Sequence, residues 1–382
     1  MLMVGRPAAI AQPERQITLN DRERYIATIL GQPTDRAPFW LFWGPWGRTF
    51  QRWQTEGLPQ RLHTFADIQT EFDSDTMPLT LPVNIGPCPE IELVILEEDE
   101  DYVVYKDTWS IKRRDYKHGE SMSAFLEFPV KNREDWEQFK VTHLDPHHPD
   151  RLKGPWREQG REWMTKGTPI RLGAYPNAGI FGPFRWLMGD EEGLIALISM
   201  PELAHDIMNH LATLYLTVFE QVVAEIRVDE IHLWEDMCYR NGPLISPKMW
   251  KAFLGPGYER IKAFADAHDI PIVSVDTDGN PVRIARPMID AGVNLLFPME
   301  VAAGCDVSVW RREHPELALM GGIDKRALAK GAGVIDAELV RIRPALETGR
   351  YIPALDHLVP DDVSWDNYSH YARALKALIG KT

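Results

Sequence analysis

The stretch IPIVSVDTDGNP, residues 270–281, joins a short β-branched apolar run to two acids and a turn. Residues 271–276 have the length and composition of a strand that is buried on both faces, and the Gly-Asn-Pro that follows ends it. Asp276 and Asp278 lie two residues apart, so their side chains are expected to point the same way. Two carboxylates this close repel each other unless a cation or a shared proton offsets the repulsion. The stretch therefore predicts a buried strand with an acidic, functional end.

Similar segments recur along the C-terminal half of the chain. Apolar strand candidates occupy residues 169–175, 230–236, 271–276, 294–300, 317–324 and 351–357, and helical patterns occupy 190–226, 247–268, 280–291, 305–313, 334–347 and 363–379. Two more strand candidates precede them, PFWLFWG at 38–44 and FDSDTMPLTL at 72–81. Eight buried strands that alternate with helices predict an α/β fold, a closed (β/α)8 TIM barrel. A doubly wound open sheet is the competing arrangement, but no glycine-rich dinucleotide loop follows the first strand.

Two segments are expected to lie outside the barrel. Residues 1–18 carry neither a helical nor a strand period and predict a flexible N-terminal arm, which leaves residues 19–382 as a single barrel domain. Residues 91–114 alternate on both sides of the acidic turn EEDED and predict an antiparallel β-hairpin insertion.

Composition narrows the range of partners. The 42 Lys and Arg residues against 56 Asp and Glu give a formal net charge of −14, which argues against a nucleic-acid surface. No apolar run reaches 18 residues, so no membrane span is expected. Cys88, Cys238 and Cys305 are odd in number and far apart, without zinc-type spacing, and predict a cytoplasmic protein without disulfides. A homodimer is left open.

The ends of the predicted strands are rich in acids. In a (β/α) barrel the C-terminal ends of the strands build the active site. These ends carry Glu235, Asp236, Asp276, Asp278, Glu300, Asp324, Asp356 and His357. Any one of these acids could cap the next helix or hold a loop. Together on one rim, they require a cation, a positive substrate, basic partners or shared protons.

Basic and aromatic residues stand near the same strand ends. Arg48, Arg240 and Lys325 each follow a strand, where they either bind substrate or pair with the neighbouring acids. Trp43 and Trp46 belong to an aromatic group at the end of the first predicted strand, which also includes Trp40 and Phe42. This group either roofs a flat substrate pocket or fills the barrel core.

Six segments, in family order, resemble the uroporphyrinogen decarboxylase superfamily. They are NDRERYIATILGQPTDRAPFW (20–40), NAGIFGPFRWLMGDEEGLIALISMPELAHDI (177–207), LISPKMWKAFLGPGYERI (244–261), DAGVNLLFPMEVAAGCDV (290–307), LALMGGIDKRAL (317–328) and YIPALDHLVPDDVSWDNYSHY (351–371). The resemblance implies a (β/α)8 barrel with its site at the C-terminal ends of the strands. The superfamily contains uroporphyrinogen decarboxylases, which need no cofactor, and corrinoid-linked methyltransferases, many of which use zinc.

The chain departs from both groups of relatives. WGPWGR (43–48) keeps Gly47-Arg48 but lacks the first arginine of the decarboxylases, and an acidic rim would repel a substrate that carries eight carboxylates. The thiol methyltransferases have His-x-Cys-Gly on the fifth strand and a cysteine after the last strand. Asp276, Asp278 and Asp356 stand at these positions here. By this resemblance, oxygen donors stand in this chain where the thiol methyltransferases have soft zinc ligands. Oxygen donors suit a harder ion, or zinc held by oxygens and His357.

The resulting hypothesis is a corrinoid-linked methyltransferase that acts on a small O- or N-methyl substrate, with the corrinoid carried by a partner protein in trans. Its expected site comprises His357, Glu235 and Asp236 as catalytic residues, Arg48, Trp43, Trp46, Glu300 and Arg240 as substrate-binding residues, and Asp276, Asp278 and Asp356 as ligands of a divalent metal. His357 or Glu235 would protonate the leaving group. The alternative hypothesis is a decarboxylase, a lyase acting on a tetrapyrrole-derived or small carboxylate.

Overall fold

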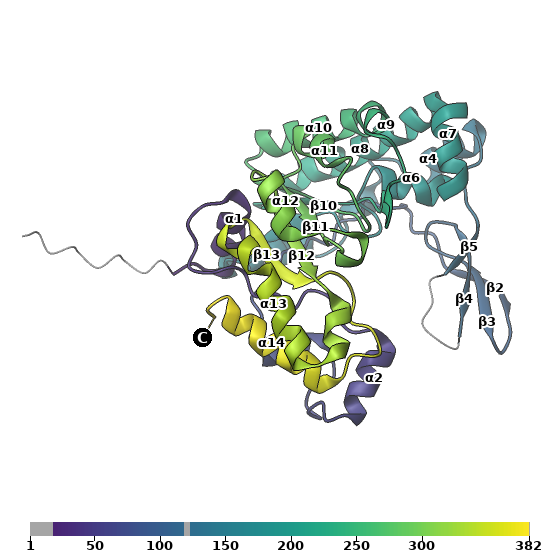
Figure 1. Cartoon of the computed structure of the whole chain (residues 1–382). Helices are drawn as coiled ribbons and strands as arrows, with labels where there is room; N and C mark the ends of the chain where they lie inside the picture. Colours follow the sequence, from purple (N-terminus) through teal and green to yellow (C-terminus); the bar gives the residue numbers. More distant parts are fainter. Residues whose placement is uncertain (1–17, 118–122, 382) are drawn as a thin grey trace, which may run out of the picture.

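A curled sheet of seven parallel strands forms the centre of the molecule (Figure 1). The computed structural model describes residues 18–117 and 123–381. In the order of the sheet, the strands are β1 (Leu79–Thr80), β6 (Ile170–Leu172), β7 (Glu230–Trp234), β10 (Ile272–Asp276), β11 (Leu295–Phe297), β12 (Ala318–Ile323) and β13 (Tyr351–Leu355). Each lies within one of the predicted strand ranges, so seven of the eight predicted strands form.

Helices connect the strands and cover the outer face of the sheet. Before β7 they are α1 (Asp21–Leu30), α2 (Gly47–Thr55), α3 (Phe65–Glu71), α4 (Arg133–His143), η1 (Pro149–Leu152), α5 (Trp156–Lys166), α6 (Phe181–Met188), α7 (Asp190–Ser199) and α8 (Pro201–Val223). After β7 they are α9 (Pro247–Phe253), α10 (Gly255–Ala267), α11 (Ala285–Asp290), η2 (Val301–Ala303), α12 (Val307–Glu313), η3 (Lys325–Lys330), α13 (Ala332–Glu347) and α14 (Trp365–Leu378). Among the described residues, no helix has the length and apolarity that a membrane crossing requires.

Residues 38–44, the first of the eight predicted strands, form no strand, so the closed barrel is confirmed only in part. The segment is followed by a single parallel bridge between Pro45 and Val359, beyond β13. Side chains satisfy its backbone groups in place of a neighbouring strand: Ser74 Oγ accepts from Leu41 N at 3.3 Å, and Gln69 Nε2 donates to Leu41 O at 2.8 Å. Because these side chains occupy the polar groups, no ladder forms here.

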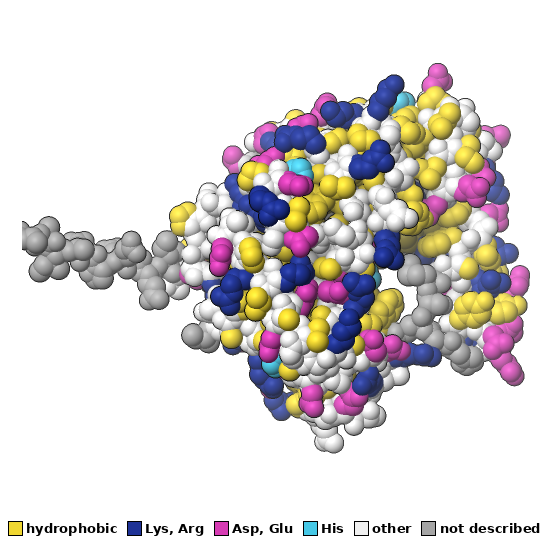
Figure 2. Space-filling view, viewed as in Figure 1, with side chains coloured by type: hydrophobic (Ala, Val, Ile, Leu, Met, Phe, Trp, Pro, Cys, Tyr) yellow, Lys and Arg dark blue, Asp and Glu magenta, His cyan; other side chains and the backbone are white. Residues whose placement is uncertain are grey.

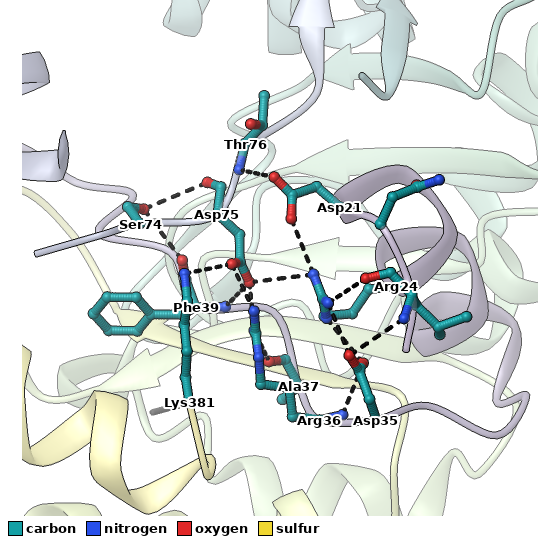
Figure 3. A network of polar contacts seen from close by, with 12 residues as sticks. Asp21, Arg24, Asp35, Arg36, Ala37, Phe39, Ser74, Asp75, Thr76 and Lys381 are labelled. Carbon is teal, nitrogen blue, oxygen red and sulfur yellow. Dashed lines mark hydrogen bonds and ion pairs between the residues drawn. The ribbon is translucent and has the colours of Figure 1, made fainter. Parts of the chain in front are cut away.

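A buried ion cluster anchors the start of this segment (Figure 3). The Asp75 carboxylate accepts hydrogen bonds from Phe39 N at 2.8 Å, from Arg36 at 2.7 Å and from Lys381 Nζ at 2.7 Å. Arg24 of α1 reaches the same carboxylate at 3.8 Å. Burial alone would raise the pKa of Asp75, but the bonds from Arg36 and Lys381 outweigh it and lower the pKa to about 2. The cluster therefore ties both ends of the described chain to the base of the sheet.

Inward-facing side chains fill the curled sheet and leave one end open. Buried residues of this interior cluster are Tyr25, Ile29, Trp40, Ile272, Leu295, Phe297, Ala318, Met320, Ile352 and Ala354. Tyr25 and Ile29 belong to α1, which packs near the N-terminal ends of the strands. The alternate strand residues face the helices and join the larger core. The C-terminal ends of the strands are thus the end at which a site can open.

The insertion is a four-stranded antiparallel sheet that projects from the central sheet (Figure 1). Its strands are β2 (Val94–Glu98), β3 (Tyr102–Lys106), β4 (Lys112–Tyr116) and β5 (Ala124–Glu127), and a short ribbon follows β7 as β8 (Cys238–Tyr239) and β9 (Gly242–Pro243). The predicted hairpin corresponds to β2 and β3, and two further strands extend it. The arm predicted at 1–18 falls, except for its last residue, outside the described residues.

Replacing Asp75 with Asn should lower the free energy of unfolding by about 3–5 kcal/mol, because Arg36 then loses the carboxylate with which it pairs and Lys381 keeps only the exposed Asp73. The Asp75 carboxylate stabilises the fold fully above pH 4, the usual pKa of an aspartate. This stabilisation is lost as the pH falls towards 2, the pKa of Asp75 in the folded chain. Urea unfolding between pH 2 and 7 measures both effects. Asp73→Asn is the matched control, since Asp73 pairs with the same Lys381 at 3.1 Å but its side chain is 63% exposed. Equal losses in the two variants would contradict the role of the cluster.

Candidate active site

Acids from four strand ends meet at the open end of the sheet. Asp276, at the end of β10, interacts electrostatically with Asp236 after β7, with Asp278 and with Glu300 after β11. Asp278 interacts in addition with Asp356, which follows β13. The parallel strands thus bring the predicted acids to one rim, although these acids lie as far apart in sequence as residues 236 and 356.

This crowding leaves carboxyl groups protonated near neutral pH. Burial, followed by the charges of Asp236 and Glu300, raises the pKa of Asp278 to about 7. Burial also raises the pKa of Asp356 to about 6 and that of Asp276 well above its usual range. A carboxyl group with a pKa near the working pH can both give and take a proton. The rim therefore contains carboxyl groups suited to acid–base chemistry, and Asp278, with a pKa of about 7, is one of them.

His357 lies beside this acid and is held by an aromatic ring. Its Nε2 is 3.8 Å from Asp278 Oδ2, and its ring stacks on Trp43 at 5.0 Å with 19° between the planes. Burial, with the nearby charge of Lys325, lowers the pKa of His357 to about 4. The imidazole is therefore neutral at pH 7. Its pKa thus lies well below that of the neighbouring Asp278 carboxyl group.

Two other rim acids hold the backbone of the site. Glu300 Oε2 accepts from Gly279 N at 2.8 Å, and its Oε1 is 3.7 Å from Lys325 Nζ. Asp356 accepts from Lys325 N at 3.0 Å and from Val301 N at 3.0 Å. Glu300 thus fixes the turn that carries Asp278, and Asp356 joins the loops that follow β11 and β12. Lys325 pairs with a neighbouring acid, one of the two outcomes expected for it.

Glu235 faces away from the rim and holds the start of α6. Its carboxylate is fully buried and accepts from Ile180 N, Phe181 N and Gly182 N at 3.0, 2.6 and 3.0 Å, and from the Tyr258 hydroxyl at 2.6 Å. Burial raises the pKa of Glu235, and these hydrogen bonds oppose the rise. The predicted catalytic role of Glu235 does not fit this placement, because its neighbours occupy both of its oxygens.

Glycines allow α6 to approach Glu235 so closely. A Cβ atom at Gly179 would lie 1.9 Å from the Trp234 carbonyl oxygen, and one at Gly182 would lie 2.6 Å from the same atom. Only a residue without a side chain fits at such distances. The sequence NAGIFGPF thereby brings three backbone N–H groups to the end of β7. The positive end of the helix dipole then favours the buried carboxylate.

An aromatic wall that the sequence analysis missed lines the rim beside Asp236. The rings of Tyr175 and Trp234 meet edge to face at 4.9 Å, and Trp186 packs against Trp234 at 5.4 Å. Asp236 has a left-handed φ of 43°, and burial raises its pKa. Arg113 of the inserted sheet covers Trp186 at 4.2 Å, which ties the insertion to the rim.

Three predicted substrate-binding residues lie further out. Arg48 is exposed on α2, and Arg240 is exposed in the turn between β8 and β9. Trp46 is half-buried at the start of α2, where its backbone N–H donates to the backbone O of Val359 at 3.2 Å. Figure 2 shows acidic and basic side chains intermixed over the face of the molecule drawn there, without one continuous field of either sign. Of the predicted substrate-binding group, the structure thus brings Trp43 and Glu300 closest to Asp278.

The predicted metal ligands do not form a preformed metal centre. Across residues 18–117 and 123–381, no three His, Cys, Asp or Glu side chains are arranged to hold a metal ion. Both oxygens of Asp356 accept backbone N–H groups, which leaves them poorly placed as ligands. The described residues therefore contain no preformed three-ligand metal site.

Acids at the carboxyl ends of the strands of a curled parallel sheet occupy the position at which enzymes with a (β/α) barrel carry their active sites. The chain belongs to the uroporphyrinogen decarboxylase (URO-D) family, whose model matches residues 187–378, half of the 382-residue chain. This confirms the resemblance found in the sequence. No curated protein matches the chain.

Solved structures support the fold. A methyltransferase from Methanosarcina mazei is similar, with a TM-score of 0.60 and 16% identity, over 94% of this chain and 99% of the other. A B12-independent methionine synthase from Shewanella sp. W3-18-1 matches over 60% of this chain and 67% of its own, with 11% identity and a TM-score of 0.31. The first likeness establishes the shared fold, and the second is too weak to support an argument.

Replacing Glu235 with Gln should lower the free energy of unfolding by about 1.5–3 kcal/mol, since a charged acceptor of four hydrogen bonds is lost. Chemical denaturation measures the change. Tyr258→Phe, which removes one of the four donors, should cost about 0.5–1.5 kcal/mol. A Glu235→Gln protein as stable as the wild type would show that the carboxylate is not what holds α6.

Asp278→Asn should have the opposite effect on stability. The pKa of Asp278 rises from its usual 3.8 to about 7 in the folded chain, so the acid favours folding fully only below pH 4. That contribution disappears as the pH rises towards 7. At pH 8 the variant should be more stable than the wild type by about 1–2 kcal/mol, a value reduced for solvent screening of a side chain that is 40% exposed. A variant that is less stable at pH 8 would indicate that Asp278 merely holds the turn.

Proposed function

We propose that this chain is a methyl-transfer enzyme of the corrinoid-linked type, which removes a methyl group from a small O- or N-methyl compound. The observation that carries the proposal is the Asp278 carboxyl group, whose pKa is raised to about 7 at the mouth of the sheet. Breaking the bond from the methyl carbon to an ether oxygen or to a neutral amine nitrogen leaves an atom that must take up a proton. Such proton transfer is typically worth 10²–10⁴-fold in rate when the donor has a pKa near the working pH.

In this mechanism the rim acids hold the substrate and Asp278 supplies the proton. As the bond to the methyl carbon breaks, the Asp278 proton passes to the leaving oxygen or nitrogen, and solvent reprotonates the carboxyl group. His357, neutral and stacked on Trp43, bounds the site on the side of Asp278 Oδ2. Tyr175 and Trp234 bound the side near Asp236. Aromatic rings and carboxylates together would also attract a positive methylated ammonium group.

The corrinoid would belong to a partner protein, as the sequence analysis expects. When bound, it would supply the nucleophile that accepts the methyl group. Two tyrosines beyond the ends of β6 and β7 offer flat surface for a macrocycle: Tyr175 is 60% and Tyr239 is 57% exposed. The chain's own residues would then bind and orient the methylated substrate while the partner covers the mouth.

The charge of the rim weighs against the decarboxylase alternative. A carboxylate substrate requires cations at the site, because like charges within a partly desolvated pocket repel each other. Lys325, whose charge acts on both Asp278 and Asp356, already faces Glu300 at 3.7 Å. The acids therefore favour a neutral or positively charged substrate over an anionic one.

The proposal is tested by adding cob(I)alamin and a panel of methyl ethers and methylated amines to the purified protein, and following methylcobalamin by its visible spectrum. The wild type should transfer methyl groups, with a rate that falls as the pH rises through about 7 and Asp278 loses its proton. Asp278→Asn should be slower by about 100-fold or more.

Asp324→Asn is the matched control for this experiment. Asp324 also follows a strand of the sheet, but its carboxylate pairs with Arg326 at 2.7 Å, and its pKa is lowered. This variant should keep the wild-type rate and pH profile. Release of CO₂ from carboxylate substrates, without any methyl transfer across the panel, would overturn the proposal in favour of the lyase.

A further inference from the structure

A cavity of about 430 Å³ lies at the base of the sheet, at the end opposite the rim acids. Arg311, Arg312 and Arg350 line it, and Arg350 directly precedes the first residue of β13. Its other walls include Gln32 and Thr34, which follow α1. Among the described residues that line it, none carries a carboxylate. The cavity is therefore separate from the candidate active site and opposite to it in charge.

Arg311 carries a buried guanidinium group with which no carboxylate of the described chain pairs. The residue is 4% exposed, and its hydrogen bonds all go to backbone carbonyl groups, those of Gly349, His314, Pro315 and Leu317. Burial lowers the pKa of Arg311, and the charge of Arg350 lowers it further, so the two arginines repel each other. Burying a charge is costly unless an opposite charge offsets it. An anion in the cavity would supply that charge.

Arg151 shows what is unusual about this arrangement. It is also buried, at 2% exposed, and also donates to backbone carbonyl groups. The charges that act on it, however, are those of Cys88, Asp145 and Tyr215, which all raise its pKa. At Arg311 the largest such charge is a second guanidinium. Holding loops together therefore accounts for one buried arginine, but not for three arginines around one cavity.

Two of the three arginines keep N–H groups that a ligand can use. Arg350 donates to Ile29 O at 2.7 Å and to Glu316 O at 3.2 Å, which uses two of the five N–H groups of its guanidinium. Arg312 is exposed, and across residues 18–117 and 123–381 no group bonds to its side chain. The charge of Glu316 acts on Arg311, but this carboxylate already pairs with another arginine at 2.8 Å.

The backbone holds Arg350 over the end of α1 in an unusual conformation. Arg350 has a left-handed φ of 51°, which few residues with a side chain adopt. A Cβ atom at Gly31, the C-cap of α1, would lie 2.5 Å from Arg350 Nε. Only glycine at this position leaves room for the guanidinium where it lies. Strained backbone of this kind is concentrated at sites that bind ligands.

Helix ends offset only part of the positive charge at the cavity. Three helices end beside it, α1 at Leu30, α12 at Glu313 and α13 at Glu347. The C-terminus of a helix is equivalent to about half a negative charge. Three ends therefore offset about one and a half of the three guanidinium charges. The net positive charge that remains favours an anionic ligand.

We propose that this cavity binds a phosphate group, carried by a small phosphomonoester or present as free phosphate. A phosphomonoester presents three strong acceptor oxygens, one for each guanidinium, whereas a carboxylate presents two. The volume lies in the range of small-molecule sites, so an organic part has room beside Ala37, Pro315 and Leu346. The proposal rests on this cavity alone and does not depend on methyl transfer.

Isothermal titration calorimetry of the whole protein with inorganic phosphate, glycerol 3-phosphate and acetate, at one ionic strength, tests the site. The two phosphates should each saturate one site and compete for it, and acetate should bind at least about tenfold more weakly. Tighter binding of the ester identifies a phosphomonoester as the ligand, and tighter binding of inorganic phosphate identifies the free ion. No saturable binding of either phosphate, or acetate binding as tight as theirs, would overturn the proposal.

The charge of the ligand gives a second measurement. A phosphomonoester has a second pKa of about 6, so glycerol 3-phosphate loses a negative charge between pH 7.5 and pH 5. Its affinity should fall about tenfold over this range. Sulfate keeps both charges and should compete equally well at the two pH values. An affinity for the ester that does not change with pH would overturn the recognition of its phosphate.

Two arginine variants locate the site. Arg312→Ala should fold, because the side chain is exposed, and should weaken the binding of glycerol 3-phosphate about tenfold. Arg343→Ala is the matched control, since Arg343 is an exposed arginine on α13 that is not part of the cavity wall. Its loss should change the affinity by less than about twofold, because salt screens distant surface charges. Equal affinities in the two variants would overturn the assignment.

Discussion

The withdrawal of carboxyl groups from water at one end of a parallel sheet is the constraint on which the chemistry of this protein depends. Parallel strands direct their carboxyl ends to the same rim, so acids that are distant in sequence become neighbours. Burial and mutual repulsion then raise the pKa of Asp278 to about 7 and that of Asp356 to about 6. A rim that would carry only negative charge in water instead holds protons at neutral pH.

The opposite end of the sheet shows how partners reverse this effect. Asp75 is also buried, yet Arg36 and Lys381 lower its pKa to about 2. The same residue type thus has a pKa of about 2 at the base of the sheet and of about 7 at the C-terminal ends of the strands. Glu235 is a third case, because the N–H groups of α6 and the Tyr258 hydroxyl surround its carboxylate. Asp75 and Glu235 are surrounded by hydrogen-bond donors and stabilise the fold. The rim acids have fewer such partners and raised pKa values, as is common at functional sites.

The sequence predicts the repeating strands well because their signal is local. Residues 271–276 and 351–357 are short apolar runs with turn residues after them, and the structure contains β10 and β13 there. Residues 38–44 carry an equally apolar pattern but form no strand. Ser74 and Gln69 supply their hydrogen bonds, and this tertiary arrangement leaves no mark on the segment itself.

The site shows the same division between local and long-range information. Alternation along the strands is enough to place Asp276 and Asp278 at the rim, and the inward positions of Glu230, His232 and Ser274 could have been found from it as well. The role of Glu235 could not, since it depends on Gly179 and Gly182 bringing a helix start to the end of β7. The opposite pKa shifts of His357 and Asp278 likewise depend on burial, which a sequence does not report.

The central claim is that Asp278 carries a proton at neutral pH. It is tested most directly by a ¹³C NMR titration of the aspartate carboxyl carbons, with the Asp278 signal assigned from its loss in Asp278→Asn. Because neighbouring acids titrate together, the curve reports an apparent pKa of the group. The account predicts a midpoint near 7 for the Asp278 signal. A midpoint near its ordinary value of about 4 would contradict the account, since Asp278 would then be a carboxylate with no proton to give.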